Sequence, residues 1–577
     1  MEDGIQHVYV HGKKKGGWRA IKYVLANETF EKLASMSLIA NITVYLKTMY
    51  NMDGIMLVNV VTIWSGSSNI SSLGGAFLSD VYFGRFYTLL IGSIASLLGM
   101  GMMTLTAATP QIRPPPCHDD STCTKPTGWQ LGALYSALIL LALGSGCIRP
   151  CNIAFGADQF DTRTEKGQAQ LQRFYNWWYF TFTIALLVAL TAVVYIQTNI
   201  SWIIGFAIPT GCFVVSIIVF LVGCHTYIYH KPRGSIFIDM VKVMIAAYRK
   251  RHLTLDNKGH QKFYDPPEEI DPSVTKLNRT NRLMFLDKAA MISNLSELNC
   301  EGIATNRWRL CTVQQVEQLK CLIGCLPVWI TGILSLLAMD QQNTFGILQA
   351  IQMNRRVGKH FIIPPAWIGL TSMVSLSVWI LIYERALIPL LQKIKQDGDA
   401  RISIKERIRA GIMFSIACML TAGLVERQRR EEAMRHGIFE SPLSVFSLAP
   451  QLVLSGLIEA FAAVSIMEFF TTQMPESMRS IAGAVFFLSL SMASYLSSAI
   501  VNIIHMMTKT NDKMGWLGGH DLNQNQLDSF YFIIAGVGCF NLLYFSFFAS
   551  NYIFVSNVEV KPSEVLSREL SYSSNRT

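Results

Sequence analysis

The feature that most constrains this chain is a series of long apolar segments separated by short polar turns. A helix needs about 20 mainly apolar residues to cross a bilayer. Only 15% of the 577 residues are charged, which is too few for a soluble protein. We therefore predict an all-α membrane protein. A window of the spanning length places twelve transmembrane helices near residues 21–46, 55–79, 87–108, 129–157, 174–197, 200–229, 317–340, 361–383, 404–425, 445–470, 479–507 and 528–552.

The twelve predicted spans form two groups of six, because a long polar interval follows the sixth. Basic residues gather before the first span and in this interval, and such residues tend to remain in the cytoplasm. Since they lie between apolar segments, we expect the lipid bilayer and no nucleic acid as a partner. We predict a cytoplasmic N-terminus at 1–20, a six-helix half at 21–230, a cytoplasmic linker at 231–313, a second six-helix half at 314–552 and a cytoplasmic tail at 553–577.

The predicted linker contains one amphipathic segment. Apolar residues recur there at helical spacing from Ile236 to Tyr248, and a basic run follows them. The segment is too short and too charged to cross a membrane. Two arrangements remain open: a helix along the inner membrane surface, or a helix packed on the cytoplasmic loops.

The first candidate functional residues are Glu28, Glu31 and Lys32. The apolar part of the first span, Leu33–Leu46, is too short for a hydrocarbon core of about 30 Å, so the helix must begin earlier and carry these charges into the membrane. Their spacing puts all three on one helix face. Burial and a like charge both disfavour ionisation of one carboxylate, so the group can load and release a proton. The alternative is an interfacial cluster at the start of the helix.

Two further charges lie inside predicted spans, where ionisable residues are costly and usually functional. Arg149 in the fourth span follows small residues that allow close helix packing. Glu459 lies near the middle of the tenth span, in the other half of the chain. Because each residue is the obvious partner of the other, we expect an ion pair between the halves. A purely structural polar contact is the alternative.

The loops carry two further signals. Asp80, Gly84 and Arg85, between spans two and three, have the acid, the turn glycine and the base of the major facilitator loop motif. Two six-helix halves with such loops are typical of transporters whose halves rock against each other. Cys117 and Cys123 share the outer loop between spans three and four, and we expect a disulfide there. We expect no metal site, because no histidine or carboxylate completes one beside the other closely spaced cysteines.

These residues together resemble the plant nitrate transporter 1 / peptide transporter family. That family belongs to the proton-coupled oligopeptide transporters of the major facilitator superfamily. The resemblance runs from Trp18 to about Tyr552, and it looks closest to the branch that holds glucosinolate and nitrate carriers. Its motifs are Glu28–Lys32, Gly146–Asn152, Phe155–Asp161, Phe174–Tyr179, Phe285–Ala290 and Met474–Ser480.

The resemblance implies roles for matching positions. The charged residues of the first span match the proton-coupling motif, and Arg149 matches a basic residue that pairs with the acid matched by Glu459. Thr88 matches a threonine whose phosphorylation tunes affinity in a nitrate-transporting relative, which implies a kinase as a partner. Met339 stands where that relative has a nitrate-binding histidine, which weakens the nitrate interpretation. Ser35–Ser37 replaces the tyrosines and glycine of peptide carriers, which weakens the peptide interpretation.

We therefore predict a major facilitator fold and a proton-coupled symporter of a small anionic or glycosylated metabolite, such as a glucosinolate or related glycoside. A low-affinity nitrate transporter is the alternative, and a membrane receptor or sensor without net transport is the alternative from another class. We expect no enzyme, because the sequence contains no nucleophile elbow, His-rich metal cluster or phosphate loop. Protons are the coupling ion, no cofactor is expected, and we favour the plasma membrane over the vacuolar membrane.

Overall fold

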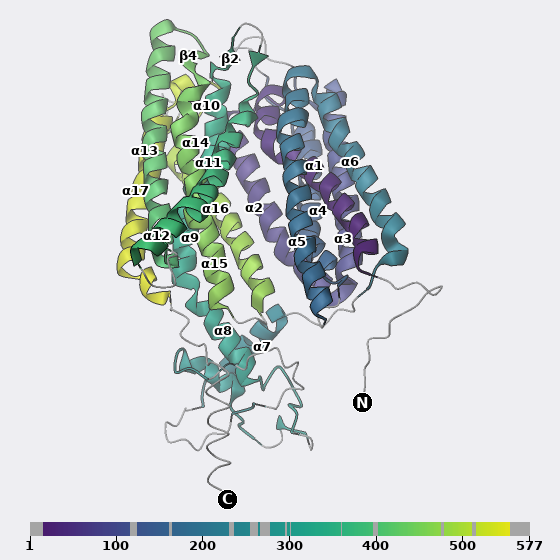
Figure 1. Ribbon diagram of the computed structural model, residues 1–577. Helices are drawn as coiled ribbons and strands as arrows, with labels where there is room; N and C mark the ends of the chain where they lie inside the picture. Colours follow the sequence, from purple (N-terminus) through teal and green to yellow (C-terminus); the bar gives the residue numbers. More distant parts are fainter. Residues whose placement is uncertain are drawn as a thin grey trace, which may run out of the picture.

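The computed structural model describes residues 16–115, 124–160, 164–229, 236–253, 263–265, 277, 279–294, 297–299, 302–358, 361–395, 402–474, 478–509 and 515–553. Most of these residues are helical, and the helices form two bundles that stand side by side (Figure 1). The N-terminal half lies on the right of Figure 1 in purple and blue, and the C-terminal half lies on the left in green and yellow. The linker emerges at the lower end of the molecule.

The N-terminal half is built from the first six apolar segments. A π-helical turn, Ser79–Phe83, joins the second helix to the third, and two such turns, Ala189–Val193 and Ile196–Ile200, lengthen the fifth. The six helices are α1 (Trp18–Met49), α2 (Gly54–Leu78), α3 (Gly84–Ala108), α4 (Gly128–Ala157), α5 (Glu165–Val188) and α6 (Trp202–Val222).

Several spans of the C-terminal half consist of more than one helical piece. α8 and α9 meet at a bend of 40°, and a π-helical turn, Glu459–Ala463, joins α14 to α15. The pieces are α8 (Val313–Gly324), α9 (Leu326–Gln341), α10 (Ile347–Ile351), α11 (Ile368–Ile382), α12 (Ile388–Lys395), α13 (Ile404–His436), α14 (Ala449–Ile458), α15 (Val464–Gln473), α16 (Arg479–Thr508) and α17 (Leu527–Phe547).

Four short strands lie in the loops of the C-terminal half. β1 (Met353–Asn354) pairs in parallel with β4 (Ser441–Ser444), and β2 (Arg356–Val357) pairs antiparallel with β3 (Phe361–Ile362). Figure 1 shows them at the end of the molecule opposite the linker. They fasten loops to one another and add no layer to the fold.

These helices account for twelve spans. Within the described ranges, nine helical segments are long and apolar enough to cross a membrane, and one of them, Gly54–Ala108, holds both α2 and α3. The bent pair of α8 with α9 and α10 supplies a further span. α1 is also long enough to cross a membrane, and it is less apolar than the others because it carries the charged residues Glu28, Glu31 and Lys32. The predicted all-α fold with twelve membrane-spanning helices in two six-helix halves is confirmed.

The two halves are joined at the side opposite the linker, which we call the outer side. α2 packs closely on α16, where Asn59 Nδ2 donates to Asn502 Oδ1 at 2.9 Å and the Ser67 and Tyr495 hydroxyls lie 3.0 Å apart. At the outer surface Lys47 Nζ donates to the His520 carbonyl at 2.6 Å. Every hydrogen bond between the halves within the described ranges lies from the middle of the membrane outward. The structure is therefore closed on the outer side.

The linker contains a helix, α7 (Ile236–Arg249), and a 3-10 helix, Met284–Ala290. Met240, Val243 and Ala246 of α7 are buried in one apolar cluster with Leu286 and Val313. The buried face of α7 thus packs on the linker and on α8, below the C-terminal half (Figure 1). Packing on neighbouring loops is one of the two predicted arrangements, and contact of α7 with the inner membrane surface stays a prediction.

Candidate functional site

Glu28, Glu31 and Lys32 lie on successive turns of α1, in the half of the membrane nearer the linker. Their side chains are buried, with exposed fractions of 1%, 3% and 8%. Lys32 Nζ is 3.1 Å from Glu31 Oε2 and 3.7 Å from Glu28 Oε1. The structure therefore brings two carboxylates to one ammonium group, inside the fold and away from water.

Helix α4 completes this group with two residues that lie one turn apart. Asn152 Nδ2 donates a hydrogen bond to Glu28 Oε2. Arg149 lies close enough for its charge to interact with those of Glu31 and Lys32. We call Glu28, Glu31, Lys32 and Arg149 the charged cluster. With every member ionised it holds two negative and two positive charges, so it is neutral as a whole.

Small residues let α4 approach its neighbours at this point. A methyl group on Gly144 would collide with Ser96 of α3, and one on Gly146 would collide with Ser71 of α2. The close packing brings Asn69 of α2 to Arg149, whose Nη1 donates to Asn69 Oδ1 at 2.6 Å. The small residues before Arg149 thus let α2 approach α4 closely enough for Asn69 to bind the guanidinium.

Arg149 and Glu459 form no ion pair with each other in the described part of the chain. Glu459 is partly buried at the junction of α14 and α15, and its carboxylate has no hydrogen-bond partner among the described residues. The expected pair is absent from this conformation for a physical reason. Asn69 holds Arg149 within the N-terminal half, on the linker side of the membrane, while the hydrogen bonds that join the halves lie farther outward.

The loop motif fastens α3 to α4. Arg85 Nη1 donates to Asp158 Oδ2 at 2.5 Å and to the Ala154 carbonyl at 3.3 Å, both at the end of α4. Asp80 lies within electrostatic reach of Arg85 and Asp158. Gly84 has φ 73°, a left-handed conformation that favours glycine, and this lets the chain turn from Phe83 into α3.

Two expected modification sites have different outcomes. The Thr88 side chain is buried, and its hydroxyl donates to the Gly84 carbonyl at 2.9 Å. A kinase cannot reach that hydroxyl in this conformation. Cys117 and Cys123 lie outside the described residues, so their disulfide stays a prediction.

Met339 lies on α9, where it faces the other helices of the C-terminal half. It packs against a buried apolar cluster of Leu336, Ala463 and Ala493. The next residue, Asp340, is a carboxylate that the sequence analysis missed. Its Oδ1 accepts a hydrogen bond from the Ser494 hydroxyl at 3.0 Å, and its Oδ2 is buried without a hydrogen-bond partner in the described ranges. Because Asp340 is the last residue of the seventh predicted span, it was not recognised as a charge inside the membrane.

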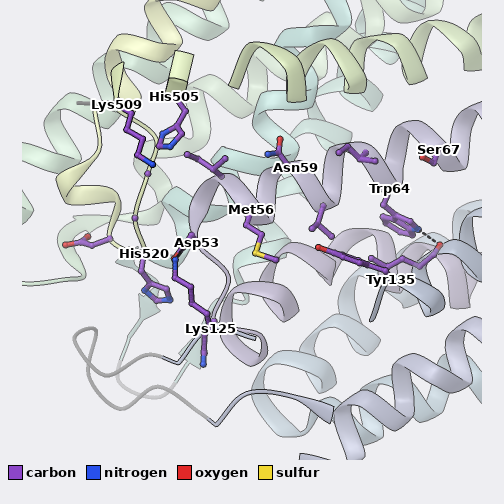
Figure 2. A pocket seen from close by; sticks show the side chains of 18 of the residues that line it. Asp53, Met56, Asn59, Trp64, Ser67, Lys125, Tyr135, His505, Lys509 and His520 are labelled. Carbon is purple, nitrogen blue, oxygen red and sulfur yellow. Dashed lines mark hydrogen bonds and ion pairs between the residues drawn. The ribbon is translucent and has the colours of Figure 1, made fainter. Parts of the chain in front are cut away.

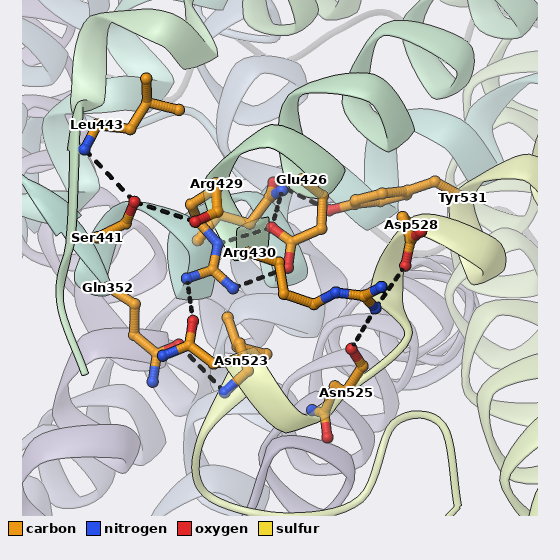
Figure 3. Close-up of polar contacts among 12 residues, drawn as sticks. Gln352, Glu426, Arg429, Arg430, Ser441, Leu443, Asn523, Asn525, Asp528 and Tyr531 are labelled. Carbon is orange, nitrogen blue, oxygen red and sulfur yellow. Dashed lines mark hydrogen bonds and ion pairs between the residues drawn. The ribbon is translucent and has the colours of Figure 1, made fainter. Parts of the chain in front are cut away.

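Another buried ion pair lies in the C-terminal half, on α13 (Figure 3). Arg429 Nε and Nη2 donate to the two carboxylate oxygens of Glu426 at 2.8 and 2.9 Å, and neither side chain is exposed. Gln349 of α10 donates to the same carboxylate, and Asn523 accepts from Arg429 Nη1, each at 2.8 Å. The span was predicted to end near residue 425, whereas α13 continues to His436.

Asn69 and Asn152 are the other residues that the sequence analysis did not identify as functional. Asn152 carried a usable signal, because it follows Arg149 by three residues and therefore shares its face of α4. The sequence contains no indication of a role for Asn69, because one polar residue among the serines of α2 does not reveal which residue of another helix it contacts.

Comparison with known proteins identifies the family. The pattern of the POT family (PTR2) matches residues 86–517, which is most of the chain. This chain belongs to the POT family. Protein NRT1/PTR FAMILY 2.8 of Arabidopsis thaliana is 54% identical over 542 residues, which are 94% of this chain and 96% of that protein. Protein NRT1/PTR FAMILY 2.13 of the same plant is 43% identical over 559 residues, with coverages of 96% and 89%.

Solved structures of POT family transporters have the same fold. PepTSo superposes with a TM-score of 0.67 at 18% identity, covering 92% of this chain and 98% of that one. A POT family transporter in complex with 5-aminolevulinic acid superposes with a TM-score of 0.59 at 10% identity, with coverages of 95% and 99%. The predicted family, with its plant relatives, is thus confirmed. The chain is a multi-pass membrane protein of a family of proton-coupled transporters, and that family consists of transporters and not of enzymes.

Proposed function

We propose that this POT family member moves a small anionic or glycosylated metabolite together with a proton, and that a glucosinolate or related glycoside is its substrate. The observation that carries the proposal is the charged cluster of Glu28, Glu31, Lys32 and Arg149. Titratable groups buried inside a membrane-spanning bundle are rare unless they serve transport or proton transfer. A sensor without net transport would need no such group.

The balance of charge in the cluster links proton binding to anion binding. With both carboxylates ionised, the negative and positive charges cancel, and an anion gains little by entering. A proton on one of the two carboxylates leaves one net positive charge, and a substrate anion beside Lys32 and Arg149 then restores neutrality. Since an unbalanced buried charge is costly, the proton raises the affinity for the anion, and the anion raises the affinity for the proton.

Arg149 is the residue best suited to hold the anion. A guanidinium has five N–H donors in a planar fork that matches a sulfate or carboxylate group. Asn69 is its only hydrogen-bond partner among the described residues, and it is a neutral one. The remaining donors are therefore available to a substrate that enters from the linker side.

We also propose that Arg149 and Glu459 pair when the linker side closes. The two residues lie on opposite halves, and rocking of the halves changes their separation. In the present conformation the two charges are not paired with each other. Arg149 donates to Asn69 within the N-terminal half, and the Glu459 carboxylate in the C-terminal half has no described partner. Closure around a bound anion would let Arg149 exchange Asn69 for Glu459, so that a loaded carrier can reopen outward.

Nitrate remains the second candidate substrate, because Arg149 can bind any small anion. Met339 argues against it. The side chain lies among apolar residues and offers no hydrogen bond to an ion as small as nitrate. An apolar side chain at this position is more compatible with an organic substrate such as a glycoside than with a small inorganic anion.

Two finer expectations belong to the same proposal. We favour the plasma membrane over the vacuolar membrane, which a fluorescent fusion in plant cells would test. We further propose that a kinase acts on Thr88 only in a conformation that releases its hydroxyl from the Gly84 carbonyl.

The test is uptake in oocytes at acidic and at neutral external pH, with glucosinolates, other glycosides, nitrate and dipeptides offered in parallel. We expect uptake of one glycoside class that is stimulated by acid and lost when a protonophore removes the gradient. Nitrate uptake alone would favour the second candidate. If acid drives none of these compounds at normal surface expression, the sensor would be the better interpretation.

A further inference from the structure

A cavity of about 1120 Å³ lies on the outer half of the molecule, away from the charged cluster (Figure 2). Its walls come from α2, α4, the end of α16 and the loops at the outer surface. Residues of the charged cluster do not line it. Most of its wall is apolar and is formed by Met56, Val60, Ile63, Trp64, Tyr135 and Ile139.

The outer rim of this cavity is charged. Lys509 and His505 lie one turn apart at the end of α16, and Lys125 lies opposite them, as Figure 2 shows. Lys125 Nζ is 2.7 Å from Asp53 Oδ2, and Asp521 also lines the cavity, so the rim offers both cations and carboxylates, as a zwitterionic headgroup requires. The cavity is therefore amphipathic, with a polar outer end and an apolar inner end.

The depth of the cavity matches one leaflet of a bilayer. Its wall follows α2 from Asp53 to Ser67, a length of about 20 Å at about 1.5 Å per residue. One leaflet contributes about half of a hydrocarbon core of about 30 Å, and its headgroup adds several more. Ile63 and Ile139, with exposed fractions of 47% and 59%, leave the wall open sideways to the acyl chains.

We propose that this cavity binds a glycerophospholipid of the outer leaflet. The acyl chain lies along α2 and α4, against Trp64 and Ile139, and the phosphate lies at the rim between Lys509 and Lys125. Charge complementarity at the rim, an apolar wall and the length of one leaflet all fit this occupant. Because α2 and α16 belong to different halves, the bound lipid touches both halves and stabilises the conformation that is closed on the outer side.

Trp64 lies in the apolar wall and can report the acyl chain directly. The full chain and its Trp64→Phe variant would be reconstituted in vesicles with rising fractions of phosphatidylcholine brominated on one acyl chain. The difference between the two fluorescence signals isolates Trp64. We expect its quenching to saturate at a low fraction of brominated lipid, while tryptophans at the general lipid surface are quenched in proportion to that fraction.

Two variants test the site itself and keep Trp64. Ile63→Phe adds volume to the wall, and Lys509→Gln removes the phosphate partner. Both should shift half-quenching to at least several-fold higher fractions of brominated lipid. Arg435→Gln, an exposed cation at the outer end of α13, is the matched control and should behave as the unmodified chain.

A second readout does not depend on Trp64→Phe. Native mass spectrometry of the detergent-purified chain should show one retained phosphatidylcholine, lost in Ile63→Phe and in Lys509→Gln but kept in Arg435→Gln. Quenching of Trp64 that rises only in proportion to the brominated fraction would overturn the proposal. So would a retained lipid that neither cavity variant removes.

Discussion

The prediction that tests the charged cluster most directly is Glu31→Gln. The substitution keeps the size and polarity of the side chain and removes its ability to exchange a proton. Lys32 loses its nearer carboxylate, at 3.1 Å, and keeps Glu28 at 3.7 Å. We expect the variant to fold and reach the membrane, because one ion pair and the hydrogen bond from Asn152 to Glu28 remain.

The expected magnitudes follow from the distances and from the proton gradient. At an effective dielectric constant of about 20, charges 3.1 Å apart attract by about 5 kcal/mol, which is the coupling that Lys32 loses. A gradient of about one pH unit stores about 1.4 kcal/mol per proton, so a monoanion that moves with one proton accumulates about tenfold. In Glu31→Gln the accumulation ratio should fall to about one, since the cluster then holds one carboxylate instead of two and no longer couples the anion to a proton.

The assay is uptake into proteoliposomes with the membrane potential clamped and an inward proton gradient. Counterflow, which needs no net proton movement, should continue in Glu31→Gln. Glu468→Gln is the matched control, because Glu468 pairs with Arg407 at 2.6 Å within the C-terminal half and outside the cluster. It should accumulate substrate as the unmodified chain does. Normal acid-driven accumulation in both Glu31→Gln and Glu28→Gln would refute the reasoning.

Three further predictions concern other parts of the structure. Arg149→Ala should stop counterflow as well as uphill uptake, because it removes the anion partner, and counterflow at the unmodified rate would show that the substrate binds elsewhere. Met339→His should raise nitrate uptake relative to glycoside uptake in oocytes; an unchanged ratio would mean that this position does not select the anion. Arg429→Met leaves the Glu426 carboxylate buried without its cation, which typically costs about 3–5 kcal/mol. Thermal unfolding in detergent should show a clear fall in Tm for Arg429→Met, whereas Arg427→Ala, which breaks an exposed pair, should change Tm little.

The sequence by itself predicted the helices and their grouping. Hydrocarbon offers no hydrogen bonds to the backbone, so a run of about 20 apolar residues has little choice but to form a helix. The same argument predicted that Glu28, Glu31 and Lys32 lie inside the membrane, because the helix of α1 could not otherwise reach across it. Their contact needed only helical spacing, which is a local property of the chain.

Only the tertiary structure decided which residues meet across helices. The extension of α13 beyond residue 425 is one case, since Glu426 and Arg429 can be buried only because Gln349 and Asn523 arrive from distant segments. The partner of Arg149 is another. The sequence offered Glu459 as the natural counter-charge, but the conformation in which the halves meet on the outer side leaves Asn69 as the partner within reach. A pairing that depends on how two rigid halves are rotated is set by their packing, and no local pattern in the sequence encodes that rotation.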